Sequence, residues 1–121
     1  MLGLKDGKSA AAPAPVKDGS ESTFMADVIE ASREVPVIVD FWATWCGPCK
    51  TLGPMLEAAV AAARGKVRMV KIDVDRNQRI AAQLRIQSIP TVYAFWQGQP
   101  VDGFQGAVPA SELRAFVDRV V

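Results

Sequence analysis

The stretch "VDFWATWCGPCK", Val39 to Lys50, decides the fold, because it runs from an apolar strand pattern into a helix pattern through two cysteines. Cys46 and Cys49 are the only cysteines in the chain of 121 residues. Two thiols three positions apart are compatible with a redox pair, half of a metal site or a small disulfide staple. The rest of the chain has to discriminate between these three readings.

Histidine is absent, and this absence excludes several kinds of site. A Ser-His-Asp triad and a Cys-His protease pair both require an imidazole. Covalent haem attachment requires histidine after the second cysteine, but Lys50 stands there. A zinc site built from this chain alone lacks two ligands, so only a metal shared between two chains stays open, and we expect no metal.

Composition predicts one globular domain with no nucleic-acid or membrane partner. Half of the residues are hydrophobic, and 14 basic residues balance 13 acidic ones. Residues 1–20 are rich in Ala, Pro, Gly and Lys, and they predict a flexible arm ahead of a domain at residues 21–121. The run "AAAPAPV" is broken by prolines and makes a poor secretion signal, so we expect a cytoplasmic protein.

Hydrophobic periodicity predicts alternating helices and strands. The expected order is helix 22–34, strand 35–43, helix 48–65, strand 66–75, helix 77–86, hairpin 90–106 and helix 109–121. Such alternation indicates an α/β fold with a parallel sheet, to which the hairpin adds an antiparallel edge. Active sites in such sheets lie beyond the carboxyl ends of the strands, where both cysteines are placed.

The position of the cysteines favours a redox pair. Residues i and i+3 in the first turn of a helix face the same side, within reach of a disulfide. A loop this small is a poor structural staple. Cys46 precedes the helix, where free N–H groups favour a thiolate, and Pro48 fits the first turn. We therefore expect an exposed, attacking Cys46 and a sheltered, resolving Cys49.

Asp40 interrupts the apolar run "VIVDFW". One interpretation places its carboxyl at the solvated end of a strand. The other buries it, which raises the pKa and makes Asp40 a proton carrier for Cys49. A purely structural α/β domain offers no reason for an acid at this position.

Three motifs, "VDFWATWCGPCK", "SIPT" (88–91) and "GFQGA" (103–107), together resemble the thioredoxin family. The resemblance runs from about Thr23 to the C-terminus and implies a thioredoxin fold, a central mixed sheet of four to five strands flanked by four helices. The doubtful strand is the first, because "PVKDG" (15–19) has no strand character.

The resemblance implies a protein-disulfide reductase. Cys46 would attack disulfide-containing substrate proteins, and Cys49 would resolve the mixed disulfide. Electrons would come from an NADPH-dependent thioredoxin reductase, with no bound cofactor besides the cysteine pair. Ile89-Pro90 resembles the family's cis-proline loop, Asp40 and Lys71 its buried carboxylate and lysine partner. The expected substrate-binding residues are Trp45, Gly47, Pro48, Val74, Ile89 and Gly106.

Two features of the sequence qualify the resemblance. Gln105 stands where the family groove usually carries an aliphatic residue. The long arm, "LRIQSIPTVYAF" and "GQPVDGFQGA" are similar to thioredoxin domains of bacterial co-chaperones. The alternative function is therefore a redox-active module that binds clients for a larger, chaperone-linked protein.

Overall fold

The structure, a computed structural model, describes residues 15–121 and contains one sheet of five strands. Along the chain these are β1 (Val16–Asp18), β2 (Val37–Trp42), β3 (Arg68–Asp73), β4 (Thr91–Trp96) and β5 (Gln99–Gln105). Their order across the sheet is β1-β3-β2-β4-β5. β1, β3 and β2 are parallel, and β4 and β5 run antiparallel to their neighbours, so the predicted mixed sheet is confirmed.

The expectation that residues 15–19 have no strand character is wrong. β1 pairs in parallel with β3, and the backbone bonds Met69 N to Pro15 O (2.7 Å) and Gly19 N to Lys71 O (2.8 Å) flank it. A three-residue edge strand depends on backbone pairing along one side, which leaves little trace in side-chain pattern. Of the arm predicted at residues 1–20, the first fourteen residues lie outside the described part of the chain, and β1 lies within the remainder.

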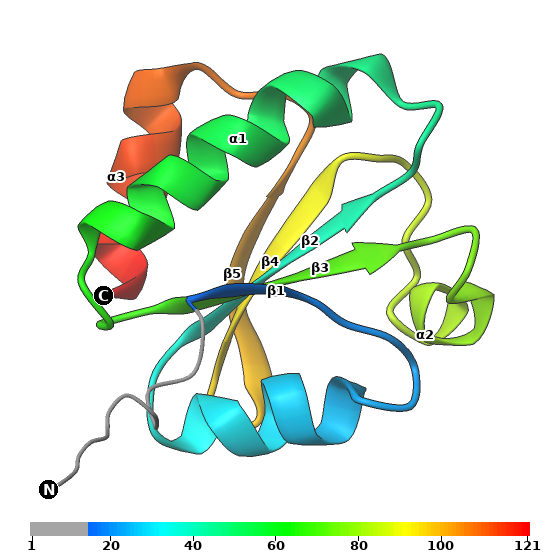
Figure 1. Cartoon of the computed structure of the whole chain (residues 1–121), viewed down its shortest axis with the longest axis horizontal. Helices are drawn as coiled ribbons and strands as arrows, with labels where there is room; N and C mark the ends of the chain where they lie inside the picture. Colours follow the sequence, from blue (N-terminus) through cyan, green and yellow to red (C-terminus); the bar gives the residue numbers. More distant parts are fainter. Residues whose placement is uncertain (1–14) are drawn as a thin grey trace, which may run out of the picture.

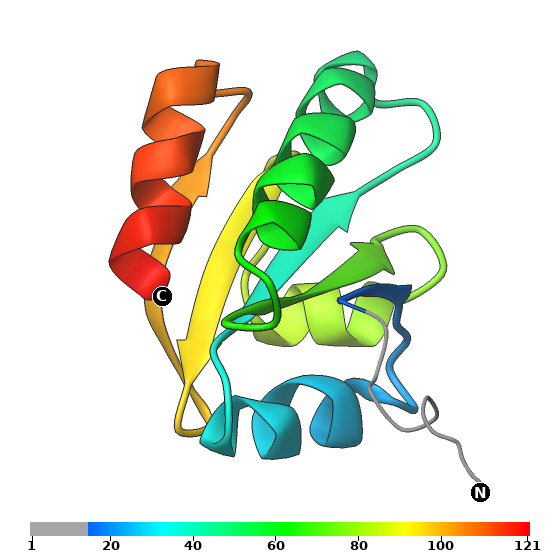
Figure 2. The ribbon, with the colours of Figure 1, turned by 60° about the vertical axis from the view of Figure 1, so that its left-hand side comes forward.

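Helices cover both faces of the sheet (Figures 1 and 2). On one face lie α1 (Gly47–Ala62) and α3 (Ala110–Val120). On the other lie α2 (Gln78–Gln83) and the consecutive π and 3-10 helices η1 (Met25–Glu30) and η2 (Ala31–Arg33). The helix predicted at residues 22–34 thus forms, but not as a regular α-helix.

β2 lies in the middle of the sheet and divides the core. Ile38 packs with Leu52 and Leu56 under α1, whereas Val39 and Phe41 pack on the opposite face. Because side chains alternate along a strand, Asp40 lies on the same face as Ile38, beneath α1. The fold thereby places a carboxyl group between the sheet and the helix that follows it.

The carboxyl end of β2 leads directly into the loop before α1 (Figure 1). The cysteines, at the start of α1, therefore lie beyond the carboxyl ends of the parallel strands. None of the helices within residues 15–121 has the length and apolar character needed to span a membrane.

Candidate active site

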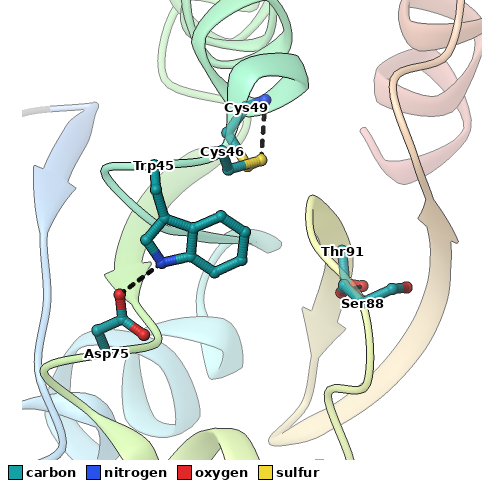
Figure 3. Close-up of a disulfide and its surroundings, with 6 residues drawn as sticks. All are labelled: Trp45, Cys46, Cys49, Asp75, Ser88 and Thr91. Carbon is teal, nitrogen blue, oxygen red and sulfur yellow. Dashed lines mark hydrogen bonds between the residues drawn. A yellow bond between two sulfur atoms is a disulfide. The ribbon is translucent and has the colours of Figure 1, made fainter.

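Cys46 and Cys49 form a disulfide at the start of α1, with their Cα atoms 5.3 Å apart. Cys46 is the N-cap residue, with an extended backbone (φ −86°, ψ 107°), and Pro48 lies in the first turn. The Sγ of Cys46 accepts a hydrogen bond from the backbone N–H of Cys49 at 3.2 Å (Figure 3). A free helix N–H at the sulfur favours a thiolate, so the predicted placement of Cys46 is confirmed.

The expected contrast in exposure between the two cysteines is wrong. Cys46 is 3% exposed and Cys49 is 6% exposed. Both pack with Ala43, and Val74 and Ile89 contact this cluster from other loops. Exposure therefore does not distinguish the two cysteines, whereas the hydrogen bond that Cys46 Sγ accepts does.

Trp45 projects from the site with 68% of its surface exposed. Its Nε1 donates a hydrogen bond to Asp75 Oδ2 at 2.8 Å, and Figure 3 shows the indole extended from the cysteine loop toward this carboxylate. Asp75 is not among the site residues predicted from the sequence. Its position in the sequence could have identified it, because Asp75 follows β3, and β3 is the parallel neighbour of the strand that leads to the cysteines.

The loop before β4 faces the same side of the molecule. The Ile89-Pro90 bond is cis, as expected. Pro90 O accepts a hydrogen bond from Gly106 N at 2.8 Å, and Gly106 has a φ of +84°, which glycine adopts readily. Thr91 Oγ1 donates to Ser88 O at 2.5 Å and closes the loop (Figure 3).

The remaining predicted groove residues border the disulfide to different degrees. Val74 and Ile89 pack directly against the cysteine cluster, whereas Gly47 and Pro48 are exposed at the start of α1. Gln105 is exposed at the end of β5, opposite Thr91 in the sheet.

Asp40 is buried, as one of the two interpretations of the sequence required, and only 2% of its surface is exposed. Its Oδ1 has no hydrogen-bond partner. Burial raises the pKa of Asp40 from 3.8 to about 6, although the charge of Lys71 lowers it and that of Glu57 raises it further. A carboxyl with such a pKa exchanges protons near neutral pH.

Lys71 is bonded to Glu57 rather than to Asp40. Its Nζ lies 3.0 Å from Glu57 Oε2 and 5.5 Å from the centroid of the Trp42 ring. Asp40 and Lys71 are neighbours in the β2–β3 register, so the sequence-based pairing identified the right strands but not the contact. Glu57, which completes the arrangement from α1, was missed.

A cavity of about 250 Å³ joins these groups to Cys49. Its lining includes Asp40, Cys49, Lys50, Glu57 and Lys71. The cavity gives Asp40 and Cys49 a common solvent-sized space through which a proton can pass. Within residues 15–121, no three His, Cys, Asp or Glu side chains cluster in a way that would hold a metal.

Comparisons with known proteins agree with this geometry. Residues 15–119 match the family model described as Thioredoxin. Thioredoxin 1 of Nostoc sp. is 41% identical over 100 residues, which cover 83% of this chain and 92% of that protein. The bifunctional thioredoxin reductase/thioredoxin of Mycobacterium leprae is 43% identical over 98% of this chain and 25% of its own length. The crystal structure of Malassezia sympodialis thioredoxin (Mala s 13) is similar with a TM-score of 0.77 and 35% identity, covering 92% of this chain and 97% of that one.

Proposed function

Because the chain belongs to the thioredoxin family and is a disulfide oxidoreductase with the active-site pair Cys46–Cys49, we propose that it works as a reductase of protein disulfides. In this proposal Cys46 attacks the substrate and Cys49 resolves the intermediate. One observation carries the assignment: the N–H of Cys49 donates to the Sγ of Cys46 at the N-terminus of α1. That donor and the dipole of the helix stabilise a thiolate on Cys46 in the reduced protein.

The reaction has two exchange steps. The Cys46 thiolate attacks one sulfur of the substrate disulfide and forms a mixed disulfide, and the other substrate sulfur leaves as a thiolate. Cys49 then transfers its proton to the carboxylate of Asp40 and attacks Cys46 Sγ. The second substrate thiolate is released, the substrate has gained two electrons, and the protein carries the Cys46–Cys49 disulfide seen in the structure.

The groove proposed for the substrate surrounds this disulfide. Val74 and Ile89 supply apolar contacts beside the cysteines, and Trp45 supplies a large exposed ring held by Asp75. Pro90, Gly106, Gly47 and Pro48 form its border in our proposal. An apolar surface next to the reacting sulfur suits an extended segment of a partner protein.

The oxidised protein has to be reduced again by a partner. We propose a thioredoxin reductase, NADPH-dependent as in the family that the motifs resemble. The M. leprae relative, whose name combines thioredoxin reductase with thioredoxin, supports such a partnership.

Trapping experiments test the assignment of the two thiols. Cys46→Ser is expected to abolish reduction of a model protein disulfide, since the attacking sulfur is lost. Cys49→Ser is expected to accumulate a mixed disulfide with the substrate, because no second thiol remains to release it. Mass spectrometry of the adducts identifies the linked cysteine. Adducts formed by Cys46→Ser and none by Cys49→Ser would reverse the roles.

A further inference from the structure

A row of charged side chains lies beneath α1, between that helix and the sheet. Lys71 on β3 is paired in register with Asp18 on β1 and with Asp40 on β2. All three residues lie on the face that α1 covers, because each is an even number of residues from an apolar residue of that core. Glu57 approaches the row from α1, so one ammonium faces three carboxyl groups.

The structure shows which carboxylate holds the ammonium. Lys71 Nζ is 3.0 Å from Glu57 Oε2, while Asp40 Oδ1 is buried without a partner. Gly53 lies one helical turn before Glu57. Because glycine has no side chain, the space between Asp40 and Glu57 stays open. A Cβ at Gly53 would lie 3.9 Å from Asp40 Oδ2 and 4.0 Å from Glu57 Oε2, which shows how closely the two acids converge.

We propose that Glu57 is a positioning residue for proton transfer: by binding the ammonium of Lys71, it holds that charge away from Asp40 and so helps Asp40 to keep a proton. The inference rests on the proposed role of Asp40 as proton acceptor for Cys49. It adds a residue outside the motifs that identify the family, and it assigns that residue a definite electrostatic effect.

The direction of the effect follows from the charges that face Asp40. Lys71 from β3 and Lys50 from α1 favour the carboxylate, whereas Glu57 from α1 and a Cys49 thiolate disfavour it. Lys71 also lines a second cavity, together with Asp18, Asp73 and Arg76. Burial raises the pKa of Asp40, the charge of Lys71 lowers it, and the charge of Glu57 raises it by direct repulsion, so the part that Glu57 plays through Lys71 has to be measured separately.

The oxidised protein offers a clean measurement, because its cysteines do not titrate. We would follow the Asp40 carboxyl carbon by NMR in the full chain between pH 3 and 9, in the parent, Glu57→Gln and Glu57→Asp. Glu57→Gln is expected to lower the midpoint of Asp40 by about one unit, since it removes a negative charge and frees Lys71. Glu57→Asp should restore most of the shift.

Asp27→Asn is the matched control. It removes a carboxylate that pairs with Lys17 at the same distance of 3.0 Å, between β1 and η1. The Asp40 midpoint should not move in this variant. An equal shift in Asp27→Asn, or an unchanged midpoint in Glu57→Gln, would overturn the proposal.

A second background separates action through Lys71 from direct repulsion. In Lys71→Met, the shift caused by Glu57→Gln should be clearly smaller than in the parent, because no ammonium remains to be released. Equal shifts in both backgrounds would show that Glu57 acts on Asp40 directly, and the positioning role would be wrong.

The pH profile of disulfide reduction separates this inference from the proposed function. If Asp40 carries the proton, the acidic limb for Glu57→Gln moves by the same amount as the Asp40 midpoint. A midpoint that moves while the profile stays fixed would show that Glu57 controls the titration of Asp40, but it would refute Asp40 as the acceptor and with it the role of Glu57 in proton transfer.

Discussion

At the scale of single residues, Asp40 is where stability and chemistry conflict. Its carboxyl is buried and Oδ1 has no hydrogen-bond partner, so the charged form loses hydration, and the charge of Lys71 offsets only part of that loss. The folded pKa of about 6 exceeds the ordinary value of 3.8. The stability linked to the protonated acid is therefore fully present below about pH 4 and is lost as pH rises through about 6.

Replacement of Asp40 should therefore have a pH-dependent effect on folding. Asp40→Ala is expected to gain stability relative to the parent between pH 4 and pH 8, by up to about 3 kcal/mol before the loss of packing is subtracted. The same variant should reduce disulfides more slowly. Urea denaturation at the two pH values measures the difference, and an identical difference in stability at both would contradict the assigned burial cost.

At the scale of elements, α1 shows how one helix serves several purposes along its length. Cys46 and Cys49 occupy its start, and Gly53 and Glu57 follow on the side that faces Asp40. Gly53 is a poor helix former, yet the space beside it is not tightly closed, because a Cβ would meet only ordinary contact distances.

Gly53→Ala is accordingly expected to stabilise the protein by about 0.5–1 kcal/mol through helix propensity alone. The added methyl group should also exclude water near Asp40 and raise its pKa further. Ala58→Gly, at an exposed position of α1, is the matched control and should destabilise by a similar amount. A Gly53→Ala variant less stable than the parent would show that the packing of α1 requires the open space beside Gly53.

The elements also show what sequence patterns can and cannot predict. β2 is buried along nearly its whole length and rich in β-branched residues, and Met69, Val70 and Ile72 of β3 are also buried, so the apolar patterns were sufficient to predict both strands. β1 was missed because edge pairing is a property of the backbone. The pairing of Lys71 with Glu57 and the bond from Trp45 to Asp75 were missed because each joins distant positions whose distance only the folded chain defines.

At the scale of the whole molecule, β1 links the N-terminal segment to both the sheet and η1. Besides its pairing with β3, Lys17 forms an ion pair with Asp27 at 3.0 Å. Glu21 lies just beyond, where its Oε2 accepts a hydrogen bond from Ile80 N at 3.1 Å near the start of α2.

Truncation measures the contribution of this segment. A chain that begins at residue 15 is expected to keep the parental stability and reductase rate. A chain that begins at residue 21 should lose at least about 2 kcal/mol, since the hydrogen bonds of β1 to β3 are removed. Thermal and urea denaturation of both chains make the comparison. Equal stability of the two would place the true domain boundary at residue 20.

The arrangement of α1 has a consequence for how this protein can change by selection. Leu52, Leu56 and Val60 anchor the helix in the core, while neighbouring positions on the same turns set the surroundings of Asp40 and Cys49. Selection of a mutant library for heat resistance alone will therefore favour variants in which the core side chains of α1 pack differently. Such repacking also shifts Cys49 relative to Asp40 by a small distance. Mutations in α1 that change thermal stability should therefore also change the rate of disulfide reduction.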